Sequence, residues 1–521
     1  MERYFNTSGA CHPHRHYMLP PERRLDTVLQ LIEQQRYFVF HSGRQTGKTT
    51  SLFWLENYLP TRGMRVLVLD VETAKDEPDA NIGFRAIFER IRIALEEGPP
   101  VDGLRAATAE QVSTWLQRPE NAILNYFRFL TAQDPRPFVL LVDEADSLIG
   151  DTIVKLLGQI RDGYLFREKV PFPASIALVG MRDIRDYAFS KKEGRVVSWF
   201  GTSSPFNVTA EATVLVPFTE AETGELLEQH TTATGQRFEP EAIAKVWELA
   251  EGHPWITNAL ADQATRKDVR DRTVPVTAAH IAAAKETIIL ERRTHIDSVI
   301  SRLREPRVAR ILGPMLLGDA IPPSDLLHDD LSYVVGMGLL RLKNGRYEVP
   351  NAVYREVIPR ALTFEAQMQM NEQTAWYVSS DGSLNMDKLF REWQSFWAAD
   401  GHLAAEGFQY REAGAHLTLM AFLQRIVNGG GRISREYGLG RGALDLLIDW
   451  KGRRYAIELK LRRDARTEPR ALEQLARYLD GLGLSEGWLV LFDLRRDLSW
   501  EEKLTMRDVT HEGKTIHIVG C

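Results

Sequence analysis

The stretch that most constrains the fold is a strand, a loop with two glycines and a helix in direct succession. Tyr37 to His41 is rich in bulky apolar residues and predicts a strand, SGRQTGKTT follows at Ser42 to Thr50, and Ser51 to Tyr58 predicts a helix. A loop in this position points backbone N–H groups at one place, which suits a phosphate group. The sequence therefore predicts an α/β fold with a nucleotide-binding loop.

The chemistry of the loop assigns its contacts. Lys48 would reach the β and γ oxygens of ATP, and Thr49 would ligate Mg²⁺. In the pattern G-x-x-x-x-G-K-[ST] the first glycine position falls at Ser42, and a small residue there still lets the backbone turn closely. The residues expected to hold the nucleotide are Ser42, Gly43, Arg44, Gln45, Thr46, Gly47, Lys48, Thr49 and Thr50.

A second motif is an apolar run that ends in two carboxylates. Phe138 to Val142 predicts a strand that is apolar on both faces, as in the middle of a parallel sheet. At its C-terminal end Asp143 would hold magnesium, and Glu144 would orient and deprotonate the attacking water. A helix N-terminus is another explanation for the acidic pair, and both can hold at once.

Further strands are predicted at Arg65 to Val71, Ser175 to Gly180 and Ala212 to Val216, with helical segments between them. Strands that alternate with helices indicate a doubly wound parallel sheet. After the fourth strand, Arg182 or Arg185 is a candidate sensor of the γ-phosphate, although an exposed ion pair explains either arginine about as well.

From Thr219 onward the pattern becomes helical, and EGHPWITNALADQ at Glu251 to Gln263 stands out. Gly252 and Pro254 fit the end of one helix and the first turn of the next. With the loop and the acidic strand, this stretch resembles the AAA-like and STAND-type P-loop ATPases over about residues 3–360. The resemblance implies that Gly252 and Pro254 belong to a helical lid and face the nucleotide, and a nucleotide-dependent homo-oligomer is a further expectation.

About Arg293 to Arg360 predicts helices followed by a hairpin, LLRLKNGRYEVP, that turns at Asn344 and Gly345. This order resembles the winged helix of those ATPases. Such a module either binds DNA or packs between domains, and both options stay open. Thr363 to Asp400 is expected to be a connector that contains an amphipathic segment, Met386 to Trp397.

A second chemical site is predicted in a hairpin near the C-terminus. Ala443 to Ile448 and Tyr455 to Leu461 are apolar-rich and predict two strands joined by a tight polar turn. Because side chains alternate along a strand, Glu458 and Lys460 share a face, and pairing brings Asp445 near Glu458. Two carboxylates and a lysine there would bind a divalent metal ion. A surface hairpin with a cross-strand ion pair is the alternative, and it leaves Asp445 unexplained inside an apolar strand.

An acidic residue on one strand and E-x-K on the next resemble the PD-(D/E)xK nuclease superfamily. The resemblance implies an α/β restriction-endonuclease-like domain in which Asp445, Glu458 and Lys460 are catalytic. The two carboxylates would hold Mg²⁺, with Mn²⁺ as an option. Glu412, on a preceding helical segment, would complete the metal ligands, although an ordinary glutamate at a helix N-terminus competes with that role.

The helix predicted after the hairpin adds two candidates. Gln474 and Tyr478 are four residues apart and share a helix face. By the same resemblance they would support the scissile phosphate. The glycines in GLGRG, Gly438 to Gly442, do not make a dinucleotide fingerprint, because a strand follows where that motif needs a helix.

Composition limits the class of protein. A chain of 521 residues is too long for one core, and its net charge of −6 argues against a basic surface over the whole chain. Arg411 to Arg470 nevertheless holds 13 Lys and Arg against 7 Asp and Glu, which allows a local nucleic-acid surface. Two cysteines, a charged start and no apolar run of about 18 residues predict a cytoplasmic protein outside the membrane. CHPHRH, at Cys11 to His16, lacks a second ligand cluster and favours a loop over a metal site.

Together the motifs predict an ATPase α/β domain at 1–217, a helical lid at 218–292, a winged helix at 293–362, a connector at 363–400 and a nuclease-like domain at 401–521. The expected function is an ATP-hydrolysing, metal-dependent nuclease that cleaves nucleic acid, with DNA favoured. The alternative is a STAND-like ATP-driven switch or oligomerising protein whose C-terminal domain binds nucleic acid without cutting it.

Overall fold

The computed structural model describes residues 2–97, 101, 103–181, 189–192, 195–198, 209–316, 329–369, 377–401, 414–427, 431–439, 442–462, 464, 466–493, 495 and 498–521. The chain forms two compact units. The first comprises Met1–His295, Ser332–Arg341 and Pro350–Ala352, and the second comprises Ile296–Leu331, Leu342–Val349 and Val353–Cys521. Among the described residues, no helix has both the length and the apolar character needed to cross a membrane.

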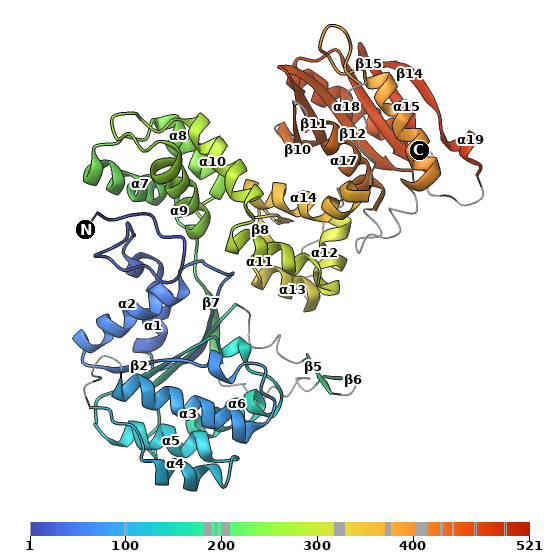
Figure 1. Cartoon of the computed structure of the whole chain (residues 1–521). Coiled ribbons are helices and arrows are strands. Elements are labelled where there is room, and N and C mark those ends of the chain that lie inside the picture. Colours follow the sequence, from blue (N-terminus) through green and yellow to red (C-terminus); the bar gives the residue numbers. More distant parts are fainter. Residues whose placement is uncertain are drawn as a thin grey trace. The chain divides into compact units, whose positions relative to one another are not determined.

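The first unit is built on a five-stranded parallel sheet in the order β2-β3-β4-β1-β7 (Figure 1). Its strands are β1 (Tyr37–His41), β2 (Arg65–Asp70), β3 (Phe138–Asp143), β4 (Ser175–Gly180) and β7 (Thr209–Val214). The predicted parallel sheet is confirmed, although β7 begins before the expected start at Ala212. Because all five strands run the same way, the loop after β1 and the acidic residues at the end of β3 lie along one edge of the sheet.

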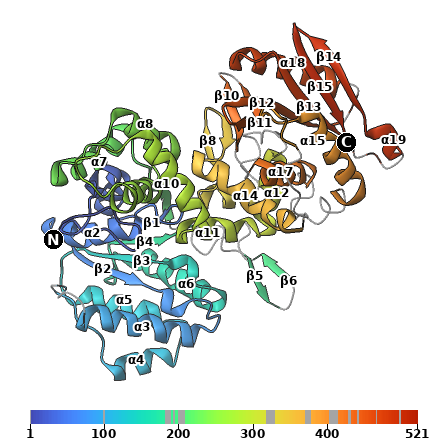
Figure 2. The same cartoon turned by 45° about the horizontal axis from the view of Figure 1, so that its top comes forward.

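Helices cover both faces of this sheet (Figure 2). One face packs against α1 (Asp26–Glu33) and α2 (Lys48–Thr61), and the other against α3 (Ala80–Glu96), α4 (Ala109–Leu116), α5 (Ala122–Ala132) and α6 (Gly150–Phe166). The buried strand β3 sends Val139 and Leu141 to the first face and Leu140 and Val142 to the second. Alternation along the strand therefore explains why the apolar run is continuous.

A stretch that the sequence predicts as one helical segment forms two helices. The sequence predicts a helical segment from Glu110 to Leu130, but α4 ends at Leu116 and α5 begins at Ala122. Pro119 lies in the break. A proline disfavours the helical conformation of the residue before it and cannot donate a helical hydrogen bond, so the chain turns there.

A helical bundle follows β7, in the region predicted as the lid. Its helices are α7 (Glu220–Thr234), α8 (Pro240–Ala250), α9 (Pro254–Asp262) and α10 (Ala278–Leu290). Thr219 and Glu222 form a reciprocal capping box at the start of α7. Pro240 and Pro254 occupy the first turns of α8 and α9, where a missing N–H costs nothing.

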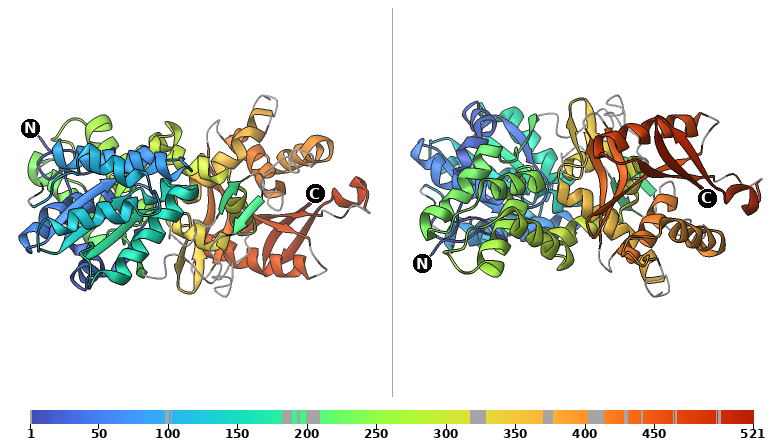
Figure 3. Two further views of the ribbon diagram at one scale, coloured as in Figure 1. Left: turned by 90° about the horizontal axis from the view of Figure 1, so that it is seen from below. Right: turned by 90° about the horizontal axis from the view of Figure 1, so that it is seen from above.

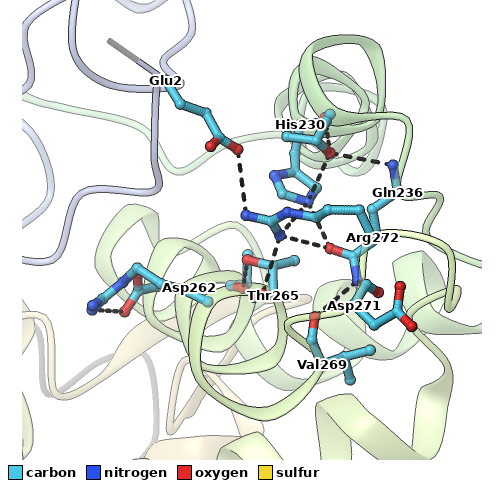
Figure 4. A network of polar contacts seen from close by, with 11 residues as sticks. Glu2, His230, Gln236, Asp262, Thr265, Val269, Asp271 and Arg272 are labelled. Atoms are coloured by element: carbon cyan, nitrogen blue, oxygen red, sulfur yellow. Dashed lines mark hydrogen bonds and ion pairs between the residues drawn. The ribbon is translucent and has the colours of Figure 1, made fainter.

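The N-terminal segment is tied to this bundle by polar contacts (Figure 4). Arg272 donates through Nη1 to Gln236 Oε1 at 2.8 Å, and its Nη2 pairs with Glu2 at 3.3 Å. Trp255 Nε1, on α9, donates to the carbonyl oxygen of Thr7 at 2.9 Å. Residues near the start of the chain therefore belong to the fold of the first unit.

The region predicted as a winged helix contains α11 (Thr294–Leu303), α12 (Pro306–Leu316), α13 (Asp329–Gly336), β8 (Arg341–Lys343) and β9 (Arg346–Glu348), followed by α14 (Ala352–Gln369). β8 and β9 form a two-stranded sheet. Asn344 and Gly345 turn between them with φ of +51° and +74°, as a tight hairpin requires. The order of elements is the one expected, and the winged-helix assignment stays a prediction. A second hairpin, β5 (Phe189–Lys192) and β6 (Arg195–Ser198), has no counterpart in the sequence analysis.

The second unit contains a six-stranded mixed sheet in the order β10-β11-β12-β13-β15-β14. The strands are β10 (Gly431–Leu439), β11 (Gly442–Trp450), β12 (Arg453–Leu461), β13 (Glu486–Phe492), β14 (Met506–His511) and β15 (Lys514–Gly520), and a short helix α19 (Trp500–Lys503) precedes β14. α18 (Thr467–Leu482) covers one face of the sheet, and α15 (Met386–Phe396) and α17 (Gly414–Val427) cover the other (Figure 3). The predicted hairpin is confirmed as β11 and β12, which pair antiparallel.

Three features of this unit differ from the sequence analysis. β10 precedes the hairpin and pairs with β11, although its glycines and charges hide a strand pattern. The sequence also predicts a strand at Thr515 to Val519 on the edge of the sheet, but this strand, β15, is interior because β14 pairs outside it. The amphipathic segment expected in a connector, now α15, places Trp393 against Phe492 in the core. An apolar helical stripe needs a partner, and the sheet provides it.

Arg65 is a buried cation that joins two parts of the first unit. It lies at the start of β2, and its side chain is 0% exposed. The guanidinium group donates to carbonyl oxygens that follow or end α5, at 2.7 to 3.2 Å. The acceptors are Leu130, Thr131, Asp134 and Arg136.

We expect Arg65→Met to lower the free energy of unfolding of the first unit by about 3 kcal/mol, because it leaves buried carbonyl oxygens without donors. Urea denaturation followed by tryptophan fluorescence measures the loss. Arg62→Met, at an arginine that is 54% exposed, is the control and should change the free energy by less than about 0.5 kcal/mol. Equal losses in the two variants would contradict this role for Arg65.

Candidate functional site

The loop between β1 and α2 has the backbone that a phosphate-binding loop needs. Gln45 and Gly47 have φ of +58° and +103°, and Gly47 is the last residue before α2. Lys48 Nζ donates to the carbonyl oxygens of Ser42 at 2.8 Å and Gly43 at 3.0 Å. The lysine is therefore folded over the loop, at the place where a phosphate group would need a positive charge.

The other loop residues have separate tasks. Thr46 Oγ1 donates to the carbonyl oxygen of Gly43 at 2.8 Å and holds the turn. Thr50 Oγ1 accepts from the N–H of Cys11 at 3.0 Å, so this hydroxyl anchors the N-terminal segment. Arg44 is exposed beside them. The nucleotide contacts of the whole loop remain predictions.

The carboxylates at the C-terminal end of β3 face the loop. Thr49 Oγ1 donates to Asp143 Oδ2 at 3.1 Å, which joins the two residues predicted to ligate magnesium. Glu144 has φ of +55°, and its N–H donates to Asp143 Oδ1 at 3.0 Å. Burial, and then the charges of Asp146 and Asp143, raise the pKa of Glu144 to about 7. A carboxylate with such a pKa is suited to accept a proton from water.

Asp146 is a site residue that the sequence analysis missed. It is 7% exposed, and its Oδ2 accepts from the N–H of Met181, directly after β4, at 3.2 Å. A Cβ atom on Gly180 would lie 2.5 Å from Asp146 Oδ1, so only glycine permits this approach. Burial lowers the pKa of Lys48, and Asp146 is the strongest of the carboxylates that oppose this shift. The sequence feature that could have indicated Asp146 is a third acidic residue three positions after Asp143.

The predicted lid element has a clear structural basis. Phe218 donates its N–H to the carbonyl oxygen of Gly252 at 2.9 Å, and a Cβ atom on Gly252 would lie 2.0 Å from the Phe218 carbonyl oxygen. Gly252 also has φ of +78°. Close packing against Phe218 therefore explains why position 252 is a glycine. Pro254 is the first residue of α9. That these two residues face the nucleotide stays a prediction.

His253 lies between Gly252 and Pro254 in the sequence, and its pKa responds to the charge of Lys48 in the loop. Its Nδ1 accepts from the N–H of Ile256 at 3.5 Å, and its ring centroid is 4.7 Å from that of His295. Burial, and to a smaller extent the positive charge of Lys48, lower the pKa of His253 to about 4. The imidazole is therefore neutral at neutral pH and lies within electrostatic range of the loop lysine.

Two predicted site residues, Arg182 and Glu412, lie outside the described residues, as does Arg185. Their roles as phosphate sensor and metal ligand stay predictions. In the part of the chain that the structure describes, three or more His, Cys, Asp or Glu side chains nowhere gather in a group that could hold a metal ion.

In the second unit, Asp445, Glu458 and Lys460 lie together, as strand alternation predicts. Lys460 Nζ is 2.6 Å from Glu458 Oε1 and 3.4 Å from Asp445 Oδ2. Asp445 Oδ2 also accepts from the N–H of Leu459 at 2.8 Å. Glu458 is 0% exposed. A surface ion pair does not describe this arrangement, because the glutamate is fully buried.

The carboxyl groups of this cluster outnumber its ammonium group. Burial, and then the charge of Asp445, raise the pKa of Glu458, and Lys460 opposes that shift. Burial disfavours the charged form of Lys460, yet the two carboxylates outweigh burial and raise the pKa of its ammonium group. Two carboxylates around one ammonium group leave room for a further positive charge, and oxygen ligands suit Mg²⁺ or Mn²⁺.

Gln474 and Tyr478 lie on α18, which covers this face of the sheet. Gln474 Nε2 donates to the Tyr478 hydroxyl at 3.0 Å. Burial raises the pKa of Tyr478, the bond from Gln474 opposes this, and the charges of Glu458 and Asp445 raise it further. The tyrosine therefore lies within electrostatic range of the carboxylates, as the predicted site requires.

No protein-family model matches the chain, and no curated protein matches it. Among solved structures, the Walker-type ATPase PABY2304 of Pyrococcus abyssi is similar at 14% identity, over 68% of this chain and 99% of that one, with a TM-score of 0.46. The RuvB Holliday junction branch migration motor of Thermotoga maritima is similar at 14% identity, over 65% and 92%, with a TM-score of 0.32. Because both TM-scores are low, the interpretation of the loop rests on its own geometry.

Asp146 offers a test of the first site. We expect Asp146→Ala to reduce kcat for ATP hydrolysis by more than about tenfold with little change in KM, because it removes both a charge near Lys48 and the acceptor for Met181. Asp146→Asn keeps an acceptor oxygen and should retain more activity. Steady-state phosphate release measures both variants, with Asp162→Asn on the exposed side of α6 as the control. Full activity of Asp146→Ala would show that Asp146 has no such role.

Proposed function

We propose that this chain is an ATP-hydrolysing, metal-dependent nuclease that acts on nucleic acid, with DNA favoured over RNA. The observation that supports ATP hydrolysis is the loop geometry. Lys48 lies over the loop carbonyls, Thr49 contacts Asp143, and Glu144 adjoins them. These residues supply the three functions that phosphoryl transfer needs: a cation for the phosphates, ligands for a metal ion, and a base.

The residues present fit a magnesium ion with ATP. Thr49 Oγ1 and Asp143 Oδ2 are hard oxygen donors 3.1 Å apart. When bound, Mg²⁺ would neutralise charge on the phosphate oxygens. Lys48 would exchange its two carbonyl partners for phosphate oxygens. Glu144, whose pKa is raised, would hold a water molecule and take its proton.

We expect Lys48→Ala to weaken ATP binding by at least about tenfold, because it removes the only lysine on the loop. Glu144→Gln should bind ATP as the wild type does but hydrolyse it about 100-fold more slowly, because the amide cannot accept the proton. Fluorescence titration with a labelled ATP analogue and a phosphate-release assay separate the two effects.

Lys75→Ala and Glu110→Gln, at exposed positions, are the matched controls and should behave as the wild type. Unchanged binding by Lys48→Ala would sink the proposed ATP site.

For the nuclease, the supporting observation is the buried Glu458 with Lys460 Nζ between two carboxylates. Asp445 and Glu458 would hold a divalent ion, which when bound activates water and polarises a phosphodiester. Lys460 would then stabilise negative charge on the phosphate. The Tyr478 hydroxyl, oriented by Gln474, would hold a phosphate oxygen at the edge of α18.

We expect Glu458→Gln and Lys460→Met to lose nucleic-acid cleavage by about 100-fold or more, because each removes a charge that acts on the reacting phosphate. The assay uses single-stranded and double-stranded DNA and RNA, with Mg²⁺, Mn²⁺ or EDTA, and with or without ATP. Glu486→Gln, an exposed residue on the neighbouring strand β13, is the control.

If the wild type cuts none of these substrates while it hydrolyses ATP, the alternative is favoured: an ATP-driven switch whose C-terminal domain binds nucleic acid without cutting it. We also infer that ATP controls access to the nuclease and promotes a homo-oligomer. Size-exclusion chromatography with a nonhydrolysable ATP analogue distinguishes a nucleotide-dependent assembly from a monomer.

A further inference from the structure

Three exposed arginines form a stripe on α18. The helix buries one apolar face that includes Leu475 and Leu479, so its opposite face meets solvent. Arg466, at the N-cap, and Arg470 and Arg477 lie on that outer face. Their spacings of four and seven residues place them on one line along the helix, about 16 Å long at 1.5 Å per residue. We call these three residues the arginine stripe.

The stripe differs from other arginines of the same unit. Many of those pair with a carboxylate; they are Arg391 with Asp387, Arg453 with Asp381, Arg462 and Arg507 with Glu468, and Arg495 with Asp493. Within the described ranges, no ion pair involves a guanidinium group of the stripe. An arginine in solvent without a carboxylate keeps its donors for a ligand, and its planar fork matches a phosphate group.

Carboxylates near the stripe are mostly engaged. Glu468, on the first turn of α18, pairs with two arginines, and Asp480 pairs with Lys514 at 2.7 Å. Glu473 is the remaining one on α18. It is exposed, and its backbone carbonyl oxygen accepts from Arg477 Nε at 3.3 Å, while its carboxylate pairs with neither stripe arginine near it. The outer face of the helix therefore keeps an excess of positive charge.

The stripe adjoins the proposed nuclease site. Gln474 lies one helical turn after Arg470 and donates to Tyr478, which is within electrostatic range of Asp445 and Glu458. Across the helix, the side chains therefore change from the exposed guanidinium groups of the stripe, through the Gln474 amide and the Tyr478 hydroxyl, to the carboxylates of Asp445 and Glu458. Each of these groups has a natural contact on a phosphodiester strand.

We propose that the arginine stripe binds the phosphate backbone of a nucleic-acid strand and leads it to the site of Asp445, Glu458 and Lys460. The purpose of the stripe rests on the proposed nuclease, but its binding is measurable without cleavage. Contacts to phosphates release counterions, so affinity should fall with salt, by a slope that grows with the number of arginines engaged. The recognition is of the backbone, not of base sequence.

The test uses the full chain in EDTA, where no metal-dependent cutting occurs. Fluorescence anisotropy with labelled single-stranded DNA, double-stranded DNA and RNA gives Kd from low to moderate salt. For the nucleic acid that binds tightest, R466A/R470A/R477A should lower the slope of log Kd against log salt by about 2 to 3, near 0.7 to 0.9 per arginine. R466K/R470K/R477K should keep most of the slope, because it keeps the charges.

The matched control is R391A/R453A/R507A, which removes the same charge from exposed, paired arginines of the same unit. It should leave the slope nearly unchanged. The proposal is overturned if the wild type binds none of the three nucleic acids, if the stripe variant keeps the wild-type slope, or if the control loses as much. Thermal unfolding confirms that each variant folds. If Glu458→Gln binds nucleic acid but no longer cuts it, the proposed nuclease is supported and the stripe is unaffected. If the wild type does not cut, only the proposed nuclease fails.

Discussion

The first unit depends on the parallel pairing of β1, β3 and β4. Each of these strands ends at the same edge of the sheet, so residues far apart in the chain meet there: the loop lysine, the acidic pair after β3 and the N–H of Met181 after β4. Helices cover both faces and keep the strands buried, which leaves that edge as the place for polar chemistry. Asp146 ties two of the strand ends together, and Gly180 gives it the space.

The two proposed sites share an electrostatic design. In each, one lysine lies among two or three carboxyl groups. Lys48 faces three carboxylates and holds two carbonyl oxygens, and Lys460 lies between Asp445 and Glu458. Burial disfavours the charged form of each glutamate, since charged groups lose hydration there, and the neighbouring carboxylates add to this effect. The raised pKa values of Glu144 and Glu458 are the result, and a bound cation would relieve both.

Local patterns predicted much of the fold. The apolar runs of β1 and β3, the loop between β1 and α2, and the hairpin of β11 and β12 are readable because each follows a short-range rule of period, turn or alternation. The misses depend on partners instead. β10 is a strand because β11 offers it a ladder, β15 is interior because β14 pairs with it, and α15 is core because its apolar stripe meets the sheet. Of these partners, only the strand that meets α15 lies far along the chain; β10 and β14 pair with the strands that directly follow them, and their own sequences carry a weak strand pattern.

The sequence by itself determined which chemistry is present: a loop with Lys48 and Thr49, an acidic pair after a buried strand, and Asp445, Glu458 and Lys460 on paired strands. Spacing within a strand, loop or turn is a local property, so these groupings follow from the chain alone. Only the tertiary structure decided how those groups are charged and which others join them. Burial of Glu458, the contact of Asp146 with Met181, and the place of His253 near Lys48 all come from long-range packing, and burial is what changes a pKa.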